Sequence, residues 1–330
     1  MNKLLLVLLI FIASFVDTFA QDHATIDTGK WLAFETGSRA LPDRKPTATR
    51  KATTISHLEI PRTLPKDFIV VHAGYALLYN ELHEQATWVA YNLTSAETKK
   101  VASRTNKFIP DPLVKTYSAN NRDYAGSGYD RGHLAPAGDM GWSAITMAES
   151  FYYSNMSPQV PAFNRGIWKR LEELVRTWAS ENDAVYVVTG PVLTDGLSAI
   201  GPNDVSVPLY FYKVILDYTA PDIKGIGFIL PNAGSGESLQ NYAVTIDSVE
   251  KLTGIDFYPA LPDRQEKQME SYLCIPCWSW RNGTSPRAKV VAHQKSSASV
   301  QCKGTTKAGN RCKNRTLNLT GFCYQHNRLK

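Results

Sequence analysis

Cysteine is absent from the first 273 residues of this 330-residue chain, and its five cysteines all fall between 274 and 323. A disulfide framework therefore cannot hold the main body together, which has to rely on an apolar core. Aspartate and glutamate are absent from 286–330, a stretch with ten Lys and Arg. The preceding residues carry 26 Lys and Arg against 30 Asp and Glu, so the net charge of +6 combines a slightly acidic body with a strongly basic tail.

Long apolar runs are also scarce, and only residues 4–16 form a conspicuous one. This run has the length of the apolar part of a secretory signal and is too short to span a bilayer. Lys3 precedes it and the small residue Ala20 follows it. The pattern predicts a signal peptide over 1–20, cleavage before Gln21, and a secreted or periplasmic protein without stable membrane insertion. An uncleaved membrane anchor is the alternative.

Composition divides the rest of the chain into four further parts. With 43% hydrophobic and 20% charged residues, the chain is neither disordered nor fibrous as a whole. We expect a flexible lead-in over 21–60, one main domain over 61–275, a linker over 276–300, and a small basic Cys/His unit over 301–330. No internal repeat is evident.

Within the main domain, runs of β-branched and aromatic residues bounded by turn residues predict strands. We expect these strands near 68–71, 87–91, 184–193, 209–216 and 225–230. Apolar residues at helical spacing predict a helix over 164–180 and a shorter one within 244–252, and residues 104–128 resemble a loop. Because strands outnumber helices without βαβ alternation, the pattern favours an α+β fold with a mostly antiparallel sheet.

The densest chemistry lies between residues 129 and 172. His133 stands between Gly132 and an Ala-Pro pair, outside any helix, and a neutral histidine can take a proton from water. Arg131 offers a planar donor fork that suits phosphate, while Asn164 and Glu172 offer hard oxygen atoms. These residue types suit Mg²⁺-assisted phosphodiester hydrolysis. A local Asp130–Arg131 ion pair beside a hydrogen-bonded loop histidine is an equally acceptable interpretation.

The spacing of the two oxygen donors limits how they could share a metal ion. On one regular helix, Asn164 and Glu172 would lie roughly 12 Å apart along the axis and about 80° around it. Both could face one cavity, but they could hardly both bind one small ion directly. One of them would then bind the ion and the other a metal-bound water.

Three ordered motifs resemble the DNA/RNA non-specific endonucleases, the ββα-metal or His-Me finger nucleases that include endonuclease G. They are DRGHLAPAGD at 130–139, SNMSPQ at 154–159 and NRGxWxxLE at 164–172. Residues 104–112 and 189–192 resemble segments on either side, so the likeness covers about 60–275. The resemblance implies a ββα-metal fold with a mostly antiparallel central sheet flanked by helices.

The same resemblance implies roles for individual residues. His133 would be the general base, Asn164 the direct ligand of Mg²⁺ (or Mn²⁺), and Glu172 the residue that holds a metal-bound water. Arg131 and Asn155 would position the phosphate and support the metal site.

The remaining two assignments are less direct. Arg104 would stabilise the transition state, although Arg122 lies nearby in the sequence and is the alternative. Asp130 would have a structural role.

The tail carries a second cluster of candidate ligands. Cys302, Cys312, Cys323 and His326 have the spacing C-x9-C-x10-C-x2-H, which could close a tetrahedral Zn²⁺ site. Disulfides in an oxidising compartment are the alternative. The Cys274–Cys277 pair could be a metal half-site, a redox pair or a strained disulfide. No thioredoxin-like context surrounds it, and a structural role, of which a disulfide is one form, is favoured.

Together these observations predict a secreted, metal-dependent, sugar-non-specific endonuclease that leaves 5′-phosphate products. DNA and RNA would be its substrates, and a homodimer is one candidate assembly. The alternative from another class is a catalytically idle extracellular nucleic-acid-binding protein that uses the same fold and the basic tail. A serine hydrolase is disfavoured because Gly234-Ser235-Gly236 lacks the pattern of a nucleophile elbow.

Overall fold

The computed structural model describes residues 55–280 except 117, 221 and 222, together with several short stretches between 300 and 316. The predicted signal peptide and the predicted lead-in up to residue 54 lie outside the described residues. So do 281–299 of the predicted linker and three predicted zinc ligands, Cys302, Cys323 and His326. The fourth, Cys312, is described and its side chain is buried.

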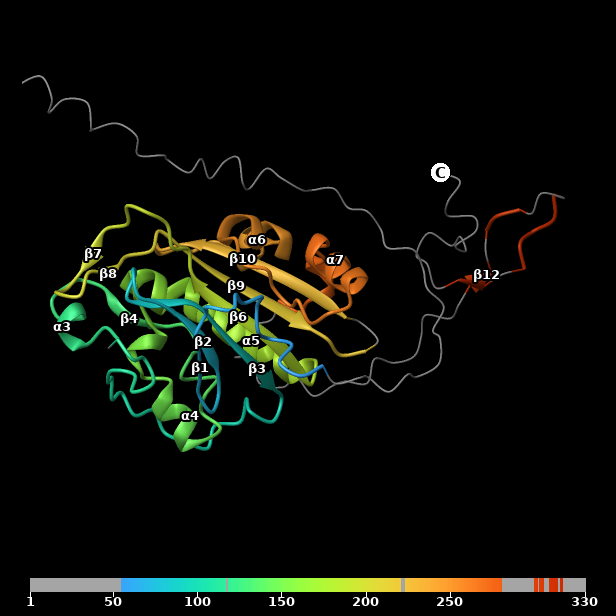
Figure 1. Ribbon diagram of the computed structural model, residues 1–330. Coiled ribbons are helices and arrows are strands. Elements are labelled where there is room, and N and C mark those ends of the chain that lie inside the picture. The colour runs from blue at the N-terminus through green and yellow to red at the C-terminus, as the bar shows by residue number, and fades with distance from the viewer. Residues whose placement is uncertain are drawn as a thin grey trace, which may run out of the picture. The chain divides into compact units, whose positions relative to one another are not determined.

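A seven-stranded sheet forms the centre of the described body (Figure 1). Its strands lie in the order β1-β2-β3-β6-β9-β10-β11, and every neighbouring pair is antiparallel. The strands are β1 (Ile69–Val71), β2 (Ala76–Asn80), β3 (Gln85–Thr94), β6 (Ala184–Pro191), β9 (Tyr210–Asp217), β10 (Lys224–Pro231) and β11 (Ala243–Val244). The predicted α+β class with an antiparallel central sheet is confirmed.

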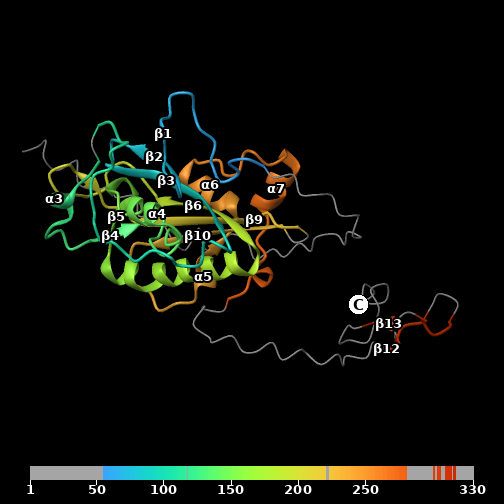
Figure 2. The ribbon, with the colours of Figure 1, turned by 90° about the horizontal axis from the view of Figure 1, so that it is seen from below.

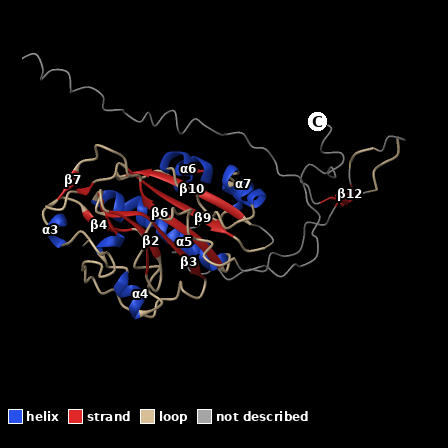
Figure 3. Cartoon of the chain, viewed as in Figure 1, coloured by secondary structure: helices blue, strands red, loops and turns tan. Residues whose placement is uncertain are grey.

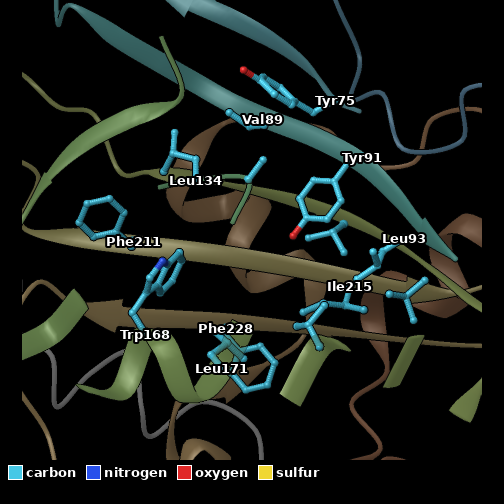
Figure 4. Packing of buried hydrophobic residues seen from close by; sticks show 14 of the residues in the cluster. Tyr75, Val89, Tyr91, Leu93, Leu134, Trp168, Leu171, Phe211, Ile215 and Phe228 are labelled. Atoms are coloured by element: carbon cyan, nitrogen blue, oxygen red, sulfur yellow. The ribbon is translucent and has the colours of Figure 1, made fainter. Parts of the chain in front are cut away.

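Helices cover both faces of this sheet (Figure 2). On one face, α5 (Lys169–Glu181) buries a stripe of apolar side chains against the strands, namely Leu171, Leu174, Val175 and Trp178. On the other face lie α6 (Ile246–Thr253) and α7 (Asp263–Ser271). Successive residues of β9 point to opposite faces, so Phe211 packs in the α5 core (Figure 4) and Tyr212 in the α6 core.

A smaller unit of two strands and a helix lies at one end of the α5 face. The strand β4 (Asp130–His133) pairs antiparallel with β5 (Met156–Gln159), and a π-helical turn, η2 (Phe163–Trp168), then leads into α5. The rings of Trp168 and Phe211 lie 5.6 Å apart and join this unit to the sheet (Figure 4). This β-β-α order is the one that the family resemblance predicts.

The predicted helix over 164–180 is wrong in one respect. Its first turn is the π-helical segment, and Gly166 has φ −107° and ψ −108°, outside the helical region. Asn164 and Glu172 therefore do not share one regular helix, and the separation calculated for a regular helix does not apply to them.

The other predicted elements are found with small shifts of their ends. Among the described residues of the predicted loop over 104–128, α3 (Asn121–Tyr124) is the one helix, and Ile109 forms an isolated bridge to Tyr152 (Figure 3). The strand β2, the helix α7 and the helix α4 (Ala144–Glu149) were not predicted. The remaining short elements are β7 (Ala199–Ile200), β8 (Val205–Ser206), η1 (Tyr153–Asn155), η3 (Leu239–Tyr242), η4 (Ile275–Cys277), β12 (Val300–Gln301) and β13 (Arg315–Thr316).

The main body also bears on the Cys274–Cys277 pair and on membrane-spanning helices. Cys274 and Cys277 form a disulfide at η4. A structural pair and an oxidised redox pair would both have this bond, so the structural role of the pair stays a prediction. Within the part of the chain that the structure describes, no helix has the length and apolar character needed to cross a membrane.

Candidate active site

A cavity of about 460 Å³ opens beside the ββα unit. Its lining comes from β4, the π-helical turn, the first turns of α5, Met147 of α4 and the segments around residues 100–104 and 136–138. Five of the six residues predicted to form the active site lie in this lining: Arg104, Arg131, His133, Asn164 and Glu172. Segments that are far apart in the sequence thus bring the predicted groups to one place.

His133 is the last residue of β4 and is only 7% exposed. Its ring packs edge-on against Phe151, with ring centroids 4.9 Å apart, and Nε2 has no hydrogen-bond partner among the described residues. Burial, and then the positive charge of Arg104, lower the pKa of His133 to about 3, although a hydrogen bond to the Arg131 backbone opposes the shift. The ring is therefore neutral near pH 7, and the lone pair on Nε2 is available to accept a proton.

Asn164 is fixed in the π-helical turn by Asp130. Its Nδ2 donates to Asp130 Oδ2 over 2.9 Å, and the same carboxylate accepts two hydrogen bonds from Arg165, of 2.8 and 2.6 Å. Because Nδ2 is used in this way, Oδ1 is the atom that Asn164 can offer to a cation in the cavity. Asp130 thus has the structural role that the resemblance implies, and it pairs with Arg165 rather than Arg131.

Glu172 lies in the first turn of α5 and is partly buried in the cavity lining. Burial raises the pKa of its carboxyl group to about 7, while the cations of Arg176 and Lys213 favour the ionised form. The proton is thus held weakly at neutral pH, and a bound cation would displace it readily.

The two candidate phosphate-binding arginines lie over aromatic rings. The Arg104 guanidinium carbon lies 4.9 Å from the centre of the Phe151 ring, and that of Arg131 lies 4.7 Å from the centre of the Phe108 ring. Arg104 Nε donates to Asn106 Oδ1 over 2.7 Å, and Arg131 Nη1 donates to Asn121 Oδ1 over 3.0 Å. Stacking and these bonds restrict the two guanidinium groups, and their other N–H groups are the ones that can donate to a phosphate. Arg122, the alternative to Arg104, is exposed on α3 and does not line the cavity.

Residues 60–264 match the sequence model of the DNA/RNA non-specific endonucleases. The chain belongs to this family. It is 39% identical over 220 residues to the mitochondrial nuclease EXOG of Danio rerio, covering 62% of this chain and 63% of that protein. It is 38% identical over 201 residues to human mitochondrial endonuclease G, covering 56% of this chain and 68% of that protein. It thus spans only about three fifths of the zebrafish EXOG.

A fungal relative and a solved structure agree with this assignment. Nuclease C1 of Cunninghamella echinulata is 38% identical over 213 residues, covering 59% of this chain and 84% of the relative. A chain in a crystal structure of an EndoG/EndoGI complex superposes with a TM-score of 0.59 and 32% identity, covering 64% of this chain and 92% of that one.

Of the six residues that the sequence predicts for the active site of this endonuclease-family chain, only Asn155 does not line the cavity. Its side chain is completely buried, and Oδ1 accepts a 2.8 Å hydrogen bond from the Ala135 backbone nitrogen. Nδ2 donates to the carbonyl oxygens of Ala135 and Ser150, at 2.9 and 2.8 Å. The amide thus fixes the backbone just after His133, and its predicted role toward the phosphate and the metal site stays a prediction.

Three charged residues that the sequence did not predict complete the electrostatics of the cavity. Arg176 lines it and pairs with the buried Asp139 over 2.6 Å. Lys213 is completely buried, with Nζ 4.7 Å from the centre of the Trp168 ring, and burial lowers the pKa of its amino group to about 8.

Sequence signals for these residues did exist. A lysine in the middle of an apolar strand is one. An arginine four residues after Glu172, on the same side of a helix, is another.

Proposed function

We propose that this chain is a metal-dependent endonuclease that hydrolyses the phosphodiester bonds of DNA and RNA. The observation that carries the proposal is the buried His133, whose Nε2 has no hydrogen-bond partner among the described residues and which lies in a cavity lined by Arg104, Arg131, Asn164 and Glu172. Homologous nucleases in the same family support the activity. A catalytically idle nucleic-acid-binding protein would have no need for an unpartnered, buried base.

The donor set of the cavity fits a hard divalent cation. Asn164 Oδ1 is a neutral oxygen ligand, and the Glu172 carboxyl group can hold a water of a hydrated ion, as Mg²⁺ prefers (or Mn²⁺ in its place). When bound, the ion would neutralise charge on the scissile phosphate and on the leaving oxygen. Asp130 keeps the Asn164 amide in the orientation that presents Oδ1.

The side chains supply the rest of the chemistry. His133 Nε2 takes a proton from a water that attacks the phosphorus, and the products carry 5′-phosphates. Arg131 and Arg104 hold phosphate oxygens and stabilise the charge that develops on them. None of these groups needs a ribose 2′-hydroxyl, which is why both DNA and RNA are proposed as substrates.

Digestion of plasmid DNA and of RNA by the mature chain tests this function. We expect cleavage of both substrates with Mg²⁺ and loss of both activities in EDTA, with recovery when Mg²⁺ is restored. Gel electrophoresis follows cleavage, and 5′-end analysis identifies the terminal phosphate. Binding of DNA and RNA without any cleavage in Mg²⁺ or Mn²⁺ would favour the idle binding protein instead.

Substitution of Arg104 by alanine should lower kcat/KM for plasmid cleavage by on the order of 100-fold, because one donor to the developing charge is lost. Arg122→Ala is the matched control, since this exposed arginine lies outside the cavity lining, and it should remain within about twofold of the unchanged chain. Initial rates at saturating Mg²⁺ give the comparison. The opposite ranking of the two variants would transfer the role to Arg122.

We further propose that the chain is exported after removal of residues 1–20. The Cys274–Cys277 disulfide supports an oxidising compartment, although zebrafish EXOG and human endonuclease G are mitochondrial by name.

Two further points stay predictions. One is that the four Cys/His residues of the tail bind zinc, with disulfides as the alternative, and the other is that the chain forms a homodimer. The division into lead-in, catalytic domain, linker and basic tail is proposed as well.

A further inference from the structure

Five carboxylates gather where α6, the segment after it and α7 meet. Asp247, Glu250 and Glu270 form one group, and Asp256, Glu266 and Glu270 form another. Within each group, one oxygen from every residue lies within 4.8 Å of the others. The two helices pack beside each other (Figure 1), and Glu270 on α7 belongs to both groups.

Glu270 gives this cluster the character of a ligand site rather than a solvated acidic surface. Its side chain is only 8% exposed, and its Oε1 is buried without a hydrogen-bond partner among the described residues. Oε1 of Glu266 is buried and unpartnered in the same way. Buried carboxylate oxygens normally have donors, because leaving them without one costs free energy.

The hydrogen-bond donors around the cluster reach some of its carboxylate oxygens but not the buried Oε1 atoms of Glu266 and Glu270. Arg62 pairs with Asp256 at its edge, and the Phe257 backbone nitrogen donates to Glu250 Oε1 over 2.8 Å. Burial, and then the neighbouring carboxylates, raise the pKa of Glu270 to about 8. The buried centre of the cluster is thus the part that still needs positive charge.

We propose that this cluster binds a Ca²⁺ ion, with the Glu270 carboxylate as the ligand common to both groups. Ca²⁺ takes six to eight oxygen ligands at about 2.3–2.6 Å and accepts carboxylates in one- or two-oxygen contact. Opposite ligands of such an ion lie about 4.6–5.2 Å apart, which fits the spread of oxygens within each group. Mg²⁺ demands shorter distances and a near-ideal octahedron, so it fits this all-carboxylate site less well.

The site is separate from the catalytic cavity. Its two helices pack on the face of the sheet opposite to α5, which carries Glu172. The ion would hold α6 to α7 and would stabilise the fold, whether or not the chain cleaves nucleic acid. The inference therefore does not rest on the proposed function.

The test compares Ca²⁺ binding and thermal unfolding of the full chain with those of two variants. Glu270→Gln removes the shared ligand charge, and Asp263→Asn makes the same change of charge at an exposed position of α7 outside both groups. We expect saturating Ca²⁺ to raise the Tm of the unchanged chain and of Asp263→Asn by on the order of 5 °C. Glu270→Gln should lose this shift and bind one Ca²⁺ fewer in calorimetry.

Two further measurements separate this site from the active site and from a folding defect. In an Asn164→Ala background, which weakens the catalytic metal site, one Ca²⁺ per chain should still bind and should be lost on adding Glu270→Gln. In EDTA at pH 8, Glu270→Gln should unfold at no lower temperature than the unchanged chain, because it removes charge from a self-repelling cluster. Equal Ca²⁺ shifts in the unchanged chain and Glu270→Gln would overturn the proposal, as would no Ca²⁺ binding by the Asn164→Ala chain.

Discussion

Substitution of His133 by alanine is expected to lower the rate of plasmid cleavage by about 10²–10⁴-fold, the usual contribution of a general base. The variant loses His133, the one histidine among the described residues that line the cavity. Its low pKa keeps the ring neutral at pH 7, so that Nε2 can accept a proton. Metal binding should survive, because Asn164 and Glu172 are unchanged. Cleavage rates on plasmid and calorimetric titration with Mg²⁺ measure the two properties separately.

His57→Ala is the matched control for this substitution. The His57 side chain is 82% exposed and lies outside the cavity lining, so its loss should leave cleavage unchanged. Thermal unfolding of both variants checks for a structural effect, since His133 packs against Phe151. A folded His133→Ala protein with full activity would remove this residue from the mechanism and leave the source of the hydroxide unassigned.

Most strands of the sheet could be predicted because their residue types are typical of strands and because turn residues follow them. Runs such as those of β6, β9 and β10 are rich in Val, Ile, Phe and Tyr and end at Gly, Pro or Asp, so periodicity and turn residues locate them to within about two residues. The helix α7 was missed because its sequence DRQEKQMES is almost entirely polar and buries only Met269 and Glu270. No apolar stripe marks such a helix.

The site was predictable as a set of residues but not as an arrangement. The family motifs identify His133, Asn164 and Glu172, yet the π-helical turn that orients Asn164 leaves no mark in the helical spacing of its apolar residues. The role of Asn155 depends on backbone atoms of Ala135 and Ser150 that only tertiary folding brings to it.

The electrostatic partner of the buried Lys213 could not be predicted from the sequence either. Lys213 lies on β9, far along the chain from Glu172, and the packing of α5 on the sheet brings the two into electrostatic contact. A lone lysine in an apolar strand signals a special environment but not its partner.

Substitution of Asn164 by alanine should weaken productive metal binding and, at ordinary Mg²⁺ concentration, lower plasmid cleavage by at least about 100-fold. Alanine removes the amide oxygen that is proposed to bind the ion, and Asp130 keeps its pair with Arg165, so the local fold should persist. Because His133 is intact, very high Mg²⁺ should recover part of the rate, which His133→Ala cannot do. The measurement is cleavage rate as a function of Mg²⁺ concentration in the two variants.

Asn241→Ala is the matched control, because the Asn241 amide also donates to a carboxylate, Glu237 Oε2 at 3.0 Å, but on an exposed surface outside the cavity lining. It should leave both the rate and its Mg²⁺ dependence unchanged. If Asn164→Ala kept the Mg²⁺ half-saturation of the unchanged chain, the ion would have to be bound without this oxygen. Glu172 would then be the direct ligand, and Asn164 would serve only to close the π-helical turn onto Asp130.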